Sequence, residues 1–379
     1  MKLFEFEAKK LLHKYGIAVP QGSIAKTPAE AEAIARQIAK PVVLKSQILV
    51  AGRGKAGGIV FADDAAEAKK IAAKLIGSSI KDSIVRSLLV EEKLNIVAQL
   101  YASVTIDRQA KTYVVLASTD GGVDIEETAK NNTERIVRAL IEPGTSFSQS
   151  QALQMLGQFK LEPDDAAKFA AALNALYRAA IESDAELSEM NPLVKTASGE
   201  FVAADARMII DDNALFRHPE FGDKNVVRVD DTPLEAEARK QGLAYVDLDG
   251  DIGIVGNGAG LVMATLDLVS YFGGKPANFL DAGGGGNVEI TKKGLLLVMS
   301  KPQVKAVLVN ILGGITRCDI VAQAITEALN ESSVKKPIVV RMMGTNEEQG
   351  TQMLHDAGIY TYPTMEKAVE EIVKIAGQS

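Results

Sequence analysis

The last third of the chain repeats one pattern: a short apolar segment, a turn containing glycine or asparagine, and a stretch with helical periodicity. The expected strands cover residues 251–256, 277–280, 304–311, 338–342 and 359–362. Strands that alternate with helices run parallel and are buried on both faces, so this order predicts an α/β domain with a doubly wound parallel sheet. Ligands of such sheets bind at the carboxyl ends of the strands. The turns expected there are at 257–260, 283–286 and 313–314.

The first 215 residues combine helices and strands in another order. Apolar residues at helical spacing end at Gly16, and residues 27–30 have the form of a capping box that starts a second helix. A long alanine-rich helix is expected from Pro163. The expected strands are at 41–45, 59–62 and 88–91, and a hairpin is expected to join 101–107 to 112–118.

A segment without periodicity, residues 216–222, followed by charged residues up to Thr232, indicates the main domain boundary. A further capping box at 232–235 then restarts a helix. Because 379 residues are too many for one ordinary core, we expect at least two domains. The predicted limits are a first domain at 1–220, a linker at 221–240 and a second domain at 241–379.

Charge and composition disfavour several classes of protein. The chain has 42 Lys and Arg against 49 Asp and Glu, and a net charge of −7 disfavours a nucleic-acid-coating protein or one held on anionic lipid. No apolar run approaches the length that spans a bilayer. The single cysteine, Cys318, cannot form an internal disulfide and is expected to be a buried thiol. Together these features predict a cytoplasmic protein that binds anions only at local sites.

The strongest local pattern is a hairpin whose loop is residues 197–199. Glycine ends this three-residue loop, at the left-handed position, which pairs Thr196 with Glu200. The same register sets Asn191 opposite Asp205. Oxygen ligands on adjacent strands suit Mg²⁺, a hard cation that also takes ligands from substrate phosphates.

Alternation places Glu189, Asn191 and Asp205 on one face of this hairpin, with Arg207 opposite Glu189. The alternative is a surface hairpin whose polar residues are simply solvated. Pro192 in the middle of a strand and the apolar residues of the other face favour the metal site.

A glycine-dense loop at 52–58 follows the strand that carries Lys45. Glycines allow successive backbone N–H groups to surround a phosphate, while Arg53 and Lys55 supply positive charge. The loop lacks the Gly-Lys-Ser/Thr ending of a Walker motif, and a flexible hairpin tip is an equal alternative. Lys45 on an apolar strand indicates an anionic partner such as phosphate, or else a strand-end lysine that reaches solvent.

In the second domain, the turn that begins at Asn257 resembles an incomplete dinucleotide-binding fingerprint. The turn 313–316 offers backbone donors just before a helix, where a carboxylate or phosphate is favoured. The three histidines, His13, His218 and His355, adjoin no glycine turn and are expected to have ordinary surface or packing roles. No nucleophile triad or zinc spacing occurs, so a covalent phosphoenzyme would need an acceptor supplied from elsewhere.

Six ordered segments of the chain are similar to those of succinyl-CoA synthetase β subunits. They are residues 3–9, 52–58, 189–193, 213–217, 278–281 and 309–315. The resemblance covers essentially the whole chain. It implies an ATP-grasp domain followed by a flavodoxin-like, doubly wound ligase domain, with ATP or ADP as nucleotide and Mg²⁺ as metal ion.

The resemblance also implies roles for individual residues. Positions that match nucleotide-binding residues are Lys45, Gly52, Arg53, Gly54, Glu91, Leu94 and Gln99. Asn191 and Asp205 match the metal ligands, and Glu189 matches the glutamate associated with orienting the histidine of an α subunit. Positions that match substrate-recognition residues are Asn257, Gly314, Ile315 and Thr316. Gln99 departs from the family, which usually has glutamate there, and puts the nucleotide preference in doubt because an amide carries no charge.

The implied reaction is the ligation of succinate and CoA with ATP, through a phosphohistidine on an α subunit that also carries the CoA site. Three alternatives stay open: the β subunit of a malate–CoA ligase, a self-contained ATP-grasp ligase, and a nucleotide-responsive subunit without catalysis. The sequence leaves open whether the assembly is a heterodimer or a heterotetramer, and whether ATP or GTP is preferred.

Overall fold

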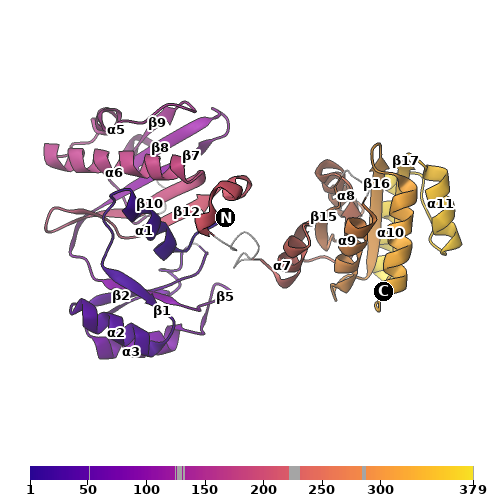
Figure 1. Ribbon diagram of the computed structural model, residues 1–379, viewed down its shortest axis with the longest axis horizontal. Coiled ribbons are helices and arrows are strands. Elements are labelled where there is room, and N and C mark those ends of the chain that lie inside the picture. Colours follow the sequence, from indigo (N-terminus) through magenta and orange to yellow (C-terminus); the bar gives the residue numbers. More distant parts are fainter. Residues whose placement is uncertain are drawn as a thin grey trace. The chain divides into compact units, whose positions relative to one another are not determined.

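The chain folds into two compact units, Met1–Asn225 and Val226–Ser379. The computed structural model describes residues 1–50, 52–123, 125, 130, 133–221, 231–283 and 287–378 (Figure 1). The boundary between the units lies within the segment 221–240 that we expected to be a linker, and helix α7 (Pro233–Lys240) occupies the end of that segment. The functional division into domains at 220 and 241 remains a prediction.

The larger sheet of the first unit has the strand order β11-β10-β7-β8-β9, with β12 also pairing with β10. Its strands are β7 (Ile96–Asp107), β8 (Thr112–Ser118), β9 (Ile136–Ile141), β10 (Ala185–Thr196), β11 (Phe201–Ala203) and β12 (Ala206–Ile210). Helices α1 (Glu5–Lys14), α5 (Gln149–Leu156) and α6 (Pro163–Glu182) pack with this sheet. The described residues of this part also include the 3₁₀ turns η1 (Thr133–Arg135) and η2 (Asp212–Arg217).

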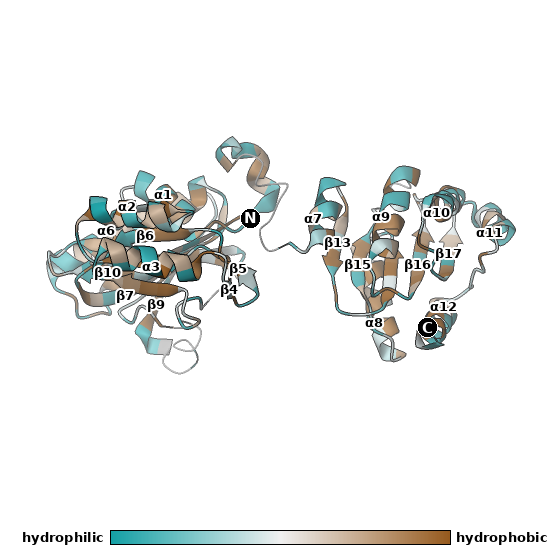
Figure 2. Ribbon diagram, turned by 90° about the horizontal axis from the view of Figure 1, so that it is seen from below, coloured by the Kyte–Doolittle hydropathy of each residue, from teal (hydrophilic) through white to brown (hydrophobic). Residues whose placement is uncertain are grey.

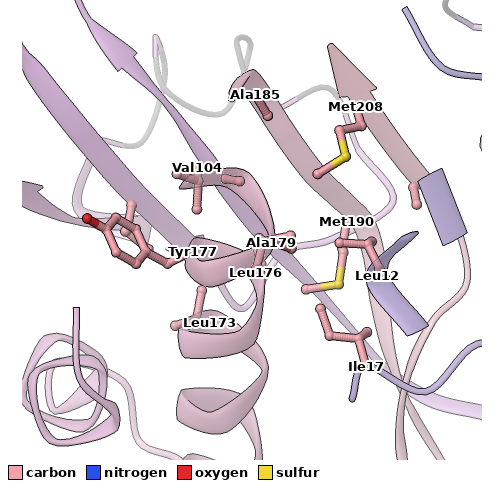
Figure 3. Close-up of a cluster of buried hydrophobic side chains, with 14 of the residues drawn as sticks. Leu12, Ile17, Val104, Leu173, Leu176, Tyr177, Ala179, Ala185, Met190 and Met208 are labelled. Carbon is pink, nitrogen blue, oxygen red and sulfur yellow. The ribbon is translucent and has the colours of Figure 1, made fainter. Parts of the chain in front are cut away.

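Helix α6 supplies the centre of the core. Leu173, Leu176 and Tyr177 project from one stripe of the helix toward the sheet, where Val104 and Met190 lie (Figure 3). The spacing of these residues places them on one face of a helix, and burial of that face stabilises it. The long alanine-rich helix expected from Pro163 is confirmed.

The smaller sheet of the first unit has the order β1-β6-β2-β3, with all neighbours antiparallel. Its strands are β1 (Gly22–Ala25), β2 (Val42–Ser46), β3 (Ile59–Ala62) and β6 (Leu88–Glu92). Helices α2 (Pro28–Ile38) and α3 (Ala65–Leu75) cover it with small buried residues, and a two-stranded ribbon, β4 (Ser79–Ile80) with β5 (Ser83–Ile84), follows α3.

The second unit has a five-stranded sheet of order β13-β15-β14-β16-β17. Its strands are β13 (Ala244–Asp247), β14 (Ile252–Gly256), β15 (Asn278–Asp281), β16 (Ala306–Gly313) and β17 (Ile338–Gly344). One face carries α8 (Ala259–Tyr271) and α12 (Met365–Gln378), and the other carries α9 (Val288–Ser300), α10 (Cys318–Glu331) and α11 (Glu347–Asp356). Figure 2 shows the apolar strands enclosed between these two helix layers, as a doubly wound fold requires.

Most of the elements expected from the sequence are confirmed. Helix α1 ends at Lys14, before Gly16 at φ 88°, and the capping boxes at Thr27 and Thr232 begin α2 and α7. The β7–β8 hairpin pairs Asp107 with Thr112, as predicted. No helix in the described part of the chain is long and apolar enough to cross a membrane.

One expected strand of the second sheet is absent, and one observed strand was not predicted. Residues 359–362 form no strand: Thr361 makes a single bridge to Val340, because Pro363 lacks an N–H and helix α12 begins two residues later. Strand β13 was missed, and it runs antiparallel to β15 at the edge of the sheet. Its sequence has no apolar–polar alternation, although Tyr245 is buried and Val246 is exposed in the structure, and the segment is too short to stand out.

Replacing Leu176 by alanine should lower the free energy of unfolding of the first unit by about 2–5 kcal/mol, because the fully buried side chain would leave a cavity. Leu153→Ala is the control, since Leu153 on α5 is 40% exposed. Urea denaturation followed by circular dichroism measures both. Equal losses in the two variants would contradict the assignment of Leu176 to the core.

A pH-dependent contribution to stability is expected from His218, whose ring nitrogens lie 2.7 Å from Asp184 Oδ2 and 3.0 Å from Glu220 Oε1. Burial alone lowers the pKa of His218, but the hydrogen bonds to the two carboxylates outweigh burial and raise it. The stabilisation is therefore complete below the ordinary histidine pKa of about 6.5 and is lost as the pH rises through the raised value. The melting temperatures of wild type and His218→Gln should converge as the pH rises above about 6.5; a constant difference would contradict this.

Candidate functional site

The predicted hairpin is present in the register that the sequence indicated. Thr196 N donates to Glu200 O at 2.9 Å, and Gly199 at φ 81° closes the three-residue loop. Further along, Leu193 pairs with Ala203 on β11 and Glu189 pairs with Arg207 on β12. The same spacing holds from Thr196 back to Leu187, and the register shifts between Leu187 and Ala185.

This register sets Asn191 opposite Asp205, and Asn191 N donates to Asp205 O at 3.3 Å. Met190, on the opposite face, is fully buried, so the expected alternation is also observed. Pro192, which has no N–H, follows a cis peptide bond at a shift in the pairing of β10 with β7. The shift explains how the central strand of the sheet accommodates a proline.

The side chains of the predicted metal ligands have separate partners. The Asn191 amide accepts from Gly122 N at 2.8 Å through Oδ1 and donates to Val123 O at 3.0 Å through Nδ2. Asp205 Oδ1 accepts from Arg53 at 3.1 Å. In the described residues no group of three His, Cys, Asp or Glu side chains is placed to hold a metal ion. Any metal bound here would need ligands beyond these two residues.

Arg53 places the glycine loop against this hairpin. The residue is 8% exposed, and its guanidinium donates to Glu5 and Asp205 through one terminal nitrogen and to Ser46 O at 3.0 Å through the other. Within the loop, Gly58 N donates back to Arg53 O at 2.8 Å. A side chain at position 58 would bring its Cβ to 3.0 Å from the same carbonyl oxygen, so glycine permits this tight turn.

Lys45, on β2, is buried and its ammonium group has three oxygen partners. Nζ lies 3.0 Å from Glu5 Oε1 and 2.9 Å from Glu91 Oε2, and it also donates to Ala204 O. An ammonium group has three N–H donors, so these contacts satisfy it. The anionic partners indicated by the sequence are thus, in this structure, two glutamates of the chain itself.

Lys9, on α1, contacts the same three groups. Its Nζ lies 2.8 Å from Glu5 Oε1, 2.7 Å from both oxygens of Glu91 and 2.8 Å from Ala204 O. Helix α1 therefore lies between the two sheets of the first unit (Figure 1).

We call the set of three cations and three carboxylates the charge cluster; its members are Lys9, Lys45, Arg53, Glu5, Glu91 and Asp205.

The charges of the cluster shift one another's pKa values. Burial raises the pKa of Glu5, but the charges of Lys45, Lys9 and Arg53 outweigh burial and hold it well below its usual range. Burial and the negative charge of Glu5 raise the pKa of Asp205, against the opposing charges of Arg53 and Lys45. Glu5 is therefore ionised more strongly than Asp205.

Glu5 and Lys9 were not among the residues that sequence analysis selected. A signal existed: they continue the stripe of Ala8 and Leu12, the buried side of α1, and lie four residues apart. Charged residues on the apolar side of a helix are rare unless they are paired.

Gln99 and Leu94 lie near the end of the large sheet. Gln99 is exposed on β7, and its backbone carbonyl oxygen accepts from Gly121 N at 3.0 Å. The side-chain oxygen of Gln99 lies beside Gly122, and a Cβ added at position 122 would be only 2.2 Å from it. Gly122 N also donates to Asn191 Oδ1. Leu94 is half-buried between β6 and β7.

In the second unit, the structure brings two of the predicted substrate residues together. Asn257 Nδ2 donates to Thr316 Oγ1 at 3.2 Å and to Leu312 O at 3.0 Å, while its Oδ1 accepts from Leu312 N at 2.9 Å. Gly314 and Ile315 lie in the same turn, and Ile315 is 88% exposed. Of the turn expected at 283–286, residues 284–286 lie outside the described residues.

The turns at the carboxyl ends of β16 and β17 are joined by backbone contacts. Thr345 N donates to Gly313 O at 2.9 Å, and Thr345 Oγ1 donates to Gly314 O at 3.1 Å. Gly344 has φ 124°, and a Cβ there would lie 1.9 Å from Gly313 O. Only glycine fits at position 344. Cys318 follows these turns as a buried thiol whose pKa is raised by burial, as expected.

Comparison with known proteins gives two matching family models and many full-length relatives. An ATP-grasp domain matches residues 2–195, and a CoA-ligase domain matches residues 255–375. The chain is 47% identical to the succinate–CoA ligase [ADP-forming] β subunit of Pyrobaculum aerophilum, with 99% of this chain and 100% of that protein covered. The chain belongs to the succinate–CoA ligase β-subunit family. A member from Thermus thermophilus, named as GDP-forming, is also 47% identical, with 100% of this chain and 99% of that protein covered.

The fold of this succinate–CoA ligase family member resembles that of an ATP citrate lyase from Methanothrix soehngenii. The TM-score is 0.77, with 18% sequence identity, over 98% of this chain and 99% of that one. The expected fold class, an ATP-grasp domain followed by a doubly wound α/β domain, is confirmed.

Lys9→Met should destabilise the first unit by about 3–5 kcal/mol, because Glu5 and Glu91 would each lose a buried cationic partner. Lys10→Met is the matched control, since Lys10 is the next residue of α1 and is exposed. Thermal and urea denaturation of both variants measure the difference. Similar melting of Lys9→Met and Lys10→Met would contradict the importance of the pairing.

Proposed function

We propose that this chain is the β subunit of a succinate–CoA ligase, which forms succinyl-CoA, ADP and phosphate from succinate, CoA and ATP. The observation that carries the proposal is the full-length similarity to relatives of that name, together with the two domain matches. The first unit binds the nucleotide, and an α subunit supplies the CoA site and the histidine that carries phosphate. The relatives named for succinate give no support to malate as the acid.

Mg²⁺ is proposed to bind at Asn191 and Asp205. Both offer oxygen ligands: the Asn191 oxygen accepts from Gly122 N and has a second lone pair, and the side chain of Asp205 is 37% exposed. Two protein ligands are few, but Mg²⁺ commonly completes its shell with waters and substrate phosphates. When bound, the ion neutralises charge on the transferred phosphoryl group.

The other proposed roles follow the positions in the chain. Lys45, Arg53 and the glycines of the loop lie at one end of the small sheet and are proposed to bind phosphates. Glu91, Leu94 and Gln99 lie on or between β6 and β7 and are proposed to contact the rest of the nucleotide. Glu189 is proposed to orient the acceptor histidine of the α subunit.

The second unit is proposed to recognise the acid substrate at the turns that carry Asn257, Gly314, Ile315 and Thr316. The side chain of Asn257 is fixed by its bonds to Leu312 and Thr316, so the donors of the turn 313–316 are held in one arrangement. Preorganised backbone donors before a helix suit a carboxylate.

The nucleotide is proposed to be ATP, although relatives with the same identity are named as ADP-forming and GDP-forming. Gln99 contacts Gly122, and Gly122 N donates to Asn191, a proposed metal ligand. The residue at position 99 is therefore proposed to influence nucleotide preference. Initial rates with ATP and GTP, and with succinate and malate, test both choices of substrate. A higher rate with malate would overturn the assignment of the acid.

Asp205→Asn should reduce phosphorylation of the α-subunit histidine roughly 100-fold or more, because a charged metal ligand is lost while the shape of the residue is kept. Asp164→Asn is the control, since the side chain of Asp164 is 78% exposed on α6. The assembled complex is labelled with ATP that carries radioactive γ-phosphate, and assembly is checked by gel filtration. Near-normal labelling of Asp205→Asn would refute the metal role.

A further inference from the structure

We propose that Glu5 is an internal counterion that occupies the phosphate-binding cations of the nucleotide-free protein and releases them when nucleotide binds. This inference rests on the proposed function, because it takes nucleotide phosphate as the ligand. None of the comparisons assigns a role to Glu5. The argument comes from the contacts of Glu5 within the charge cluster.

Glu5 is in contact with all three cations of the cluster. Its Oε1 lies 3.0 Å from Lys45 Nζ and 2.8 Å from Lys9 Nζ, and its Oε2 accepts from Arg53. The side chain is 2% exposed. It thus holds both of the cations proposed to bind phosphate, in a place that solvent does not reach.

The cluster has no spare positive charge. Three cations face three carboxylates, and the Lys45 ammonium has a partner for each of its N–H groups. A triphosphate that entered would find Lys45 and Arg53 already neutralised. To bind them, it must displace a carboxylate, because a buried anion beside another anion is strongly disfavoured.

Glu5 is the carboxylate best placed to be displaced, because it contacts both Lys45 and Arg53 and keeps partners after it gives them up. Lys9 lies one helical turn away on the same helix, and Gln47 Nε2 is 3.5 Å from Oε2. Asp205, by contrast, is a proposed metal ligand that must stay at the site. Lys9 therefore stabilises Glu5 in both states, and Glu5 acts as a positioning residue for Lys45 and Arg53.

The test compares nucleotide binding by wild type, Glu5→Gln and Glu5→Asp, using the full-length chain and isothermal titration calorimetry with Mg·ATP and Mg·ADP. Glu5→Gln removes the competing charge and should bind Mg·ATP about tenfold more tightly than wild type. Glu5→Asp keeps the charge and should bind with an affinity close to wild type. Glu32→Gln, the same change on the distant helix α2, is the control for net charge.

A second set of ligands separates charge competition from a general change of structure. Because Glu5 competes with phosphate, the gain in Glu5→Gln should appear with inorganic tripolyphosphate and be absent with adenosine. Without ligand, Glu5→Gln should also melt at a lower temperature than wild type, and saturating Mg·ATP should reduce that difference.

The outcomes distinguish this inference from the proposed function. Wild type that binds Mg·ATP, with Glu5→Gln binding no more tightly, would overturn the counterion role and leave the proposed function standing. An equal gain in Glu5→Asp, or an equal gain with adenosine, would also overturn it. Failure of wild type to bind any nucleotide would overturn the proposed function itself.

If Glu5→Gln does not fold, a crystal structure of wild type with Mg²⁺ and ATP shows whether nucleotide displaces Glu5 from its cations. The expected result is that Arg53 or Lys45 contacts phosphate and no longer contacts Glu5. Phosphate contacts to both cations, with both contacts to Glu5 retained, would overturn the inference.

Discussion

Six buried or half-buried charges must pair with one another for the first unit to fold as it does. Removing an ion from water costs several kcal/mol unless partners replace its hydration, and here the partners come from α1, β2, β6, the glycine loop and the hairpin. The Ala204 carbonyl accepts from Lys9 and from Lys45, so one backbone oxygen joins the helix and the small sheet to the hairpin. The pairing that holds the elements together also gathers the proposed phosphate-binding groups in one place.

The sequence predicted the parts of this site that depend on local geometry. The hairpin register followed from the length of the loop and the position of Gly199, and so Asn191 was correctly set opposite Asp205. The charge cluster could not be predicted in the same way. Its residues lie on elements far apart in the sequence, and which cation meets which carboxylate depends on how those elements pack. For this reason the partner of Lys45 was expected to be phosphate or solvent, and in the structure it is Glu5 and Glu91.

In the second unit too, the features that depend on local sequence were predicted, and those that depend on tertiary contacts were not. Its parallel strands and doubly wound architecture followed from the repeated pattern, because each strand is apolar and each turn is marked by glycine or asparagine. The edges of the sheet were less predictable, since β13 is short and residues 359–362 make only one bridge. Edge segments have one neighbour, so their conformation depends on that neighbour and on the next helix more than on their own residues.

The close approach of Gly344 to Gly313 has a consequence for the turn that is proposed to recognise the acid. Position 344 lies outside the turn that carries Thr316, yet any side chain there would push against the backbone from which that turn leaves β16. Variation at 344 would therefore displace the donors of the turn without altering any of its residues. The backbone contact between Gly344 and Gly313 therefore limits how far the two turns can shift relative to each other.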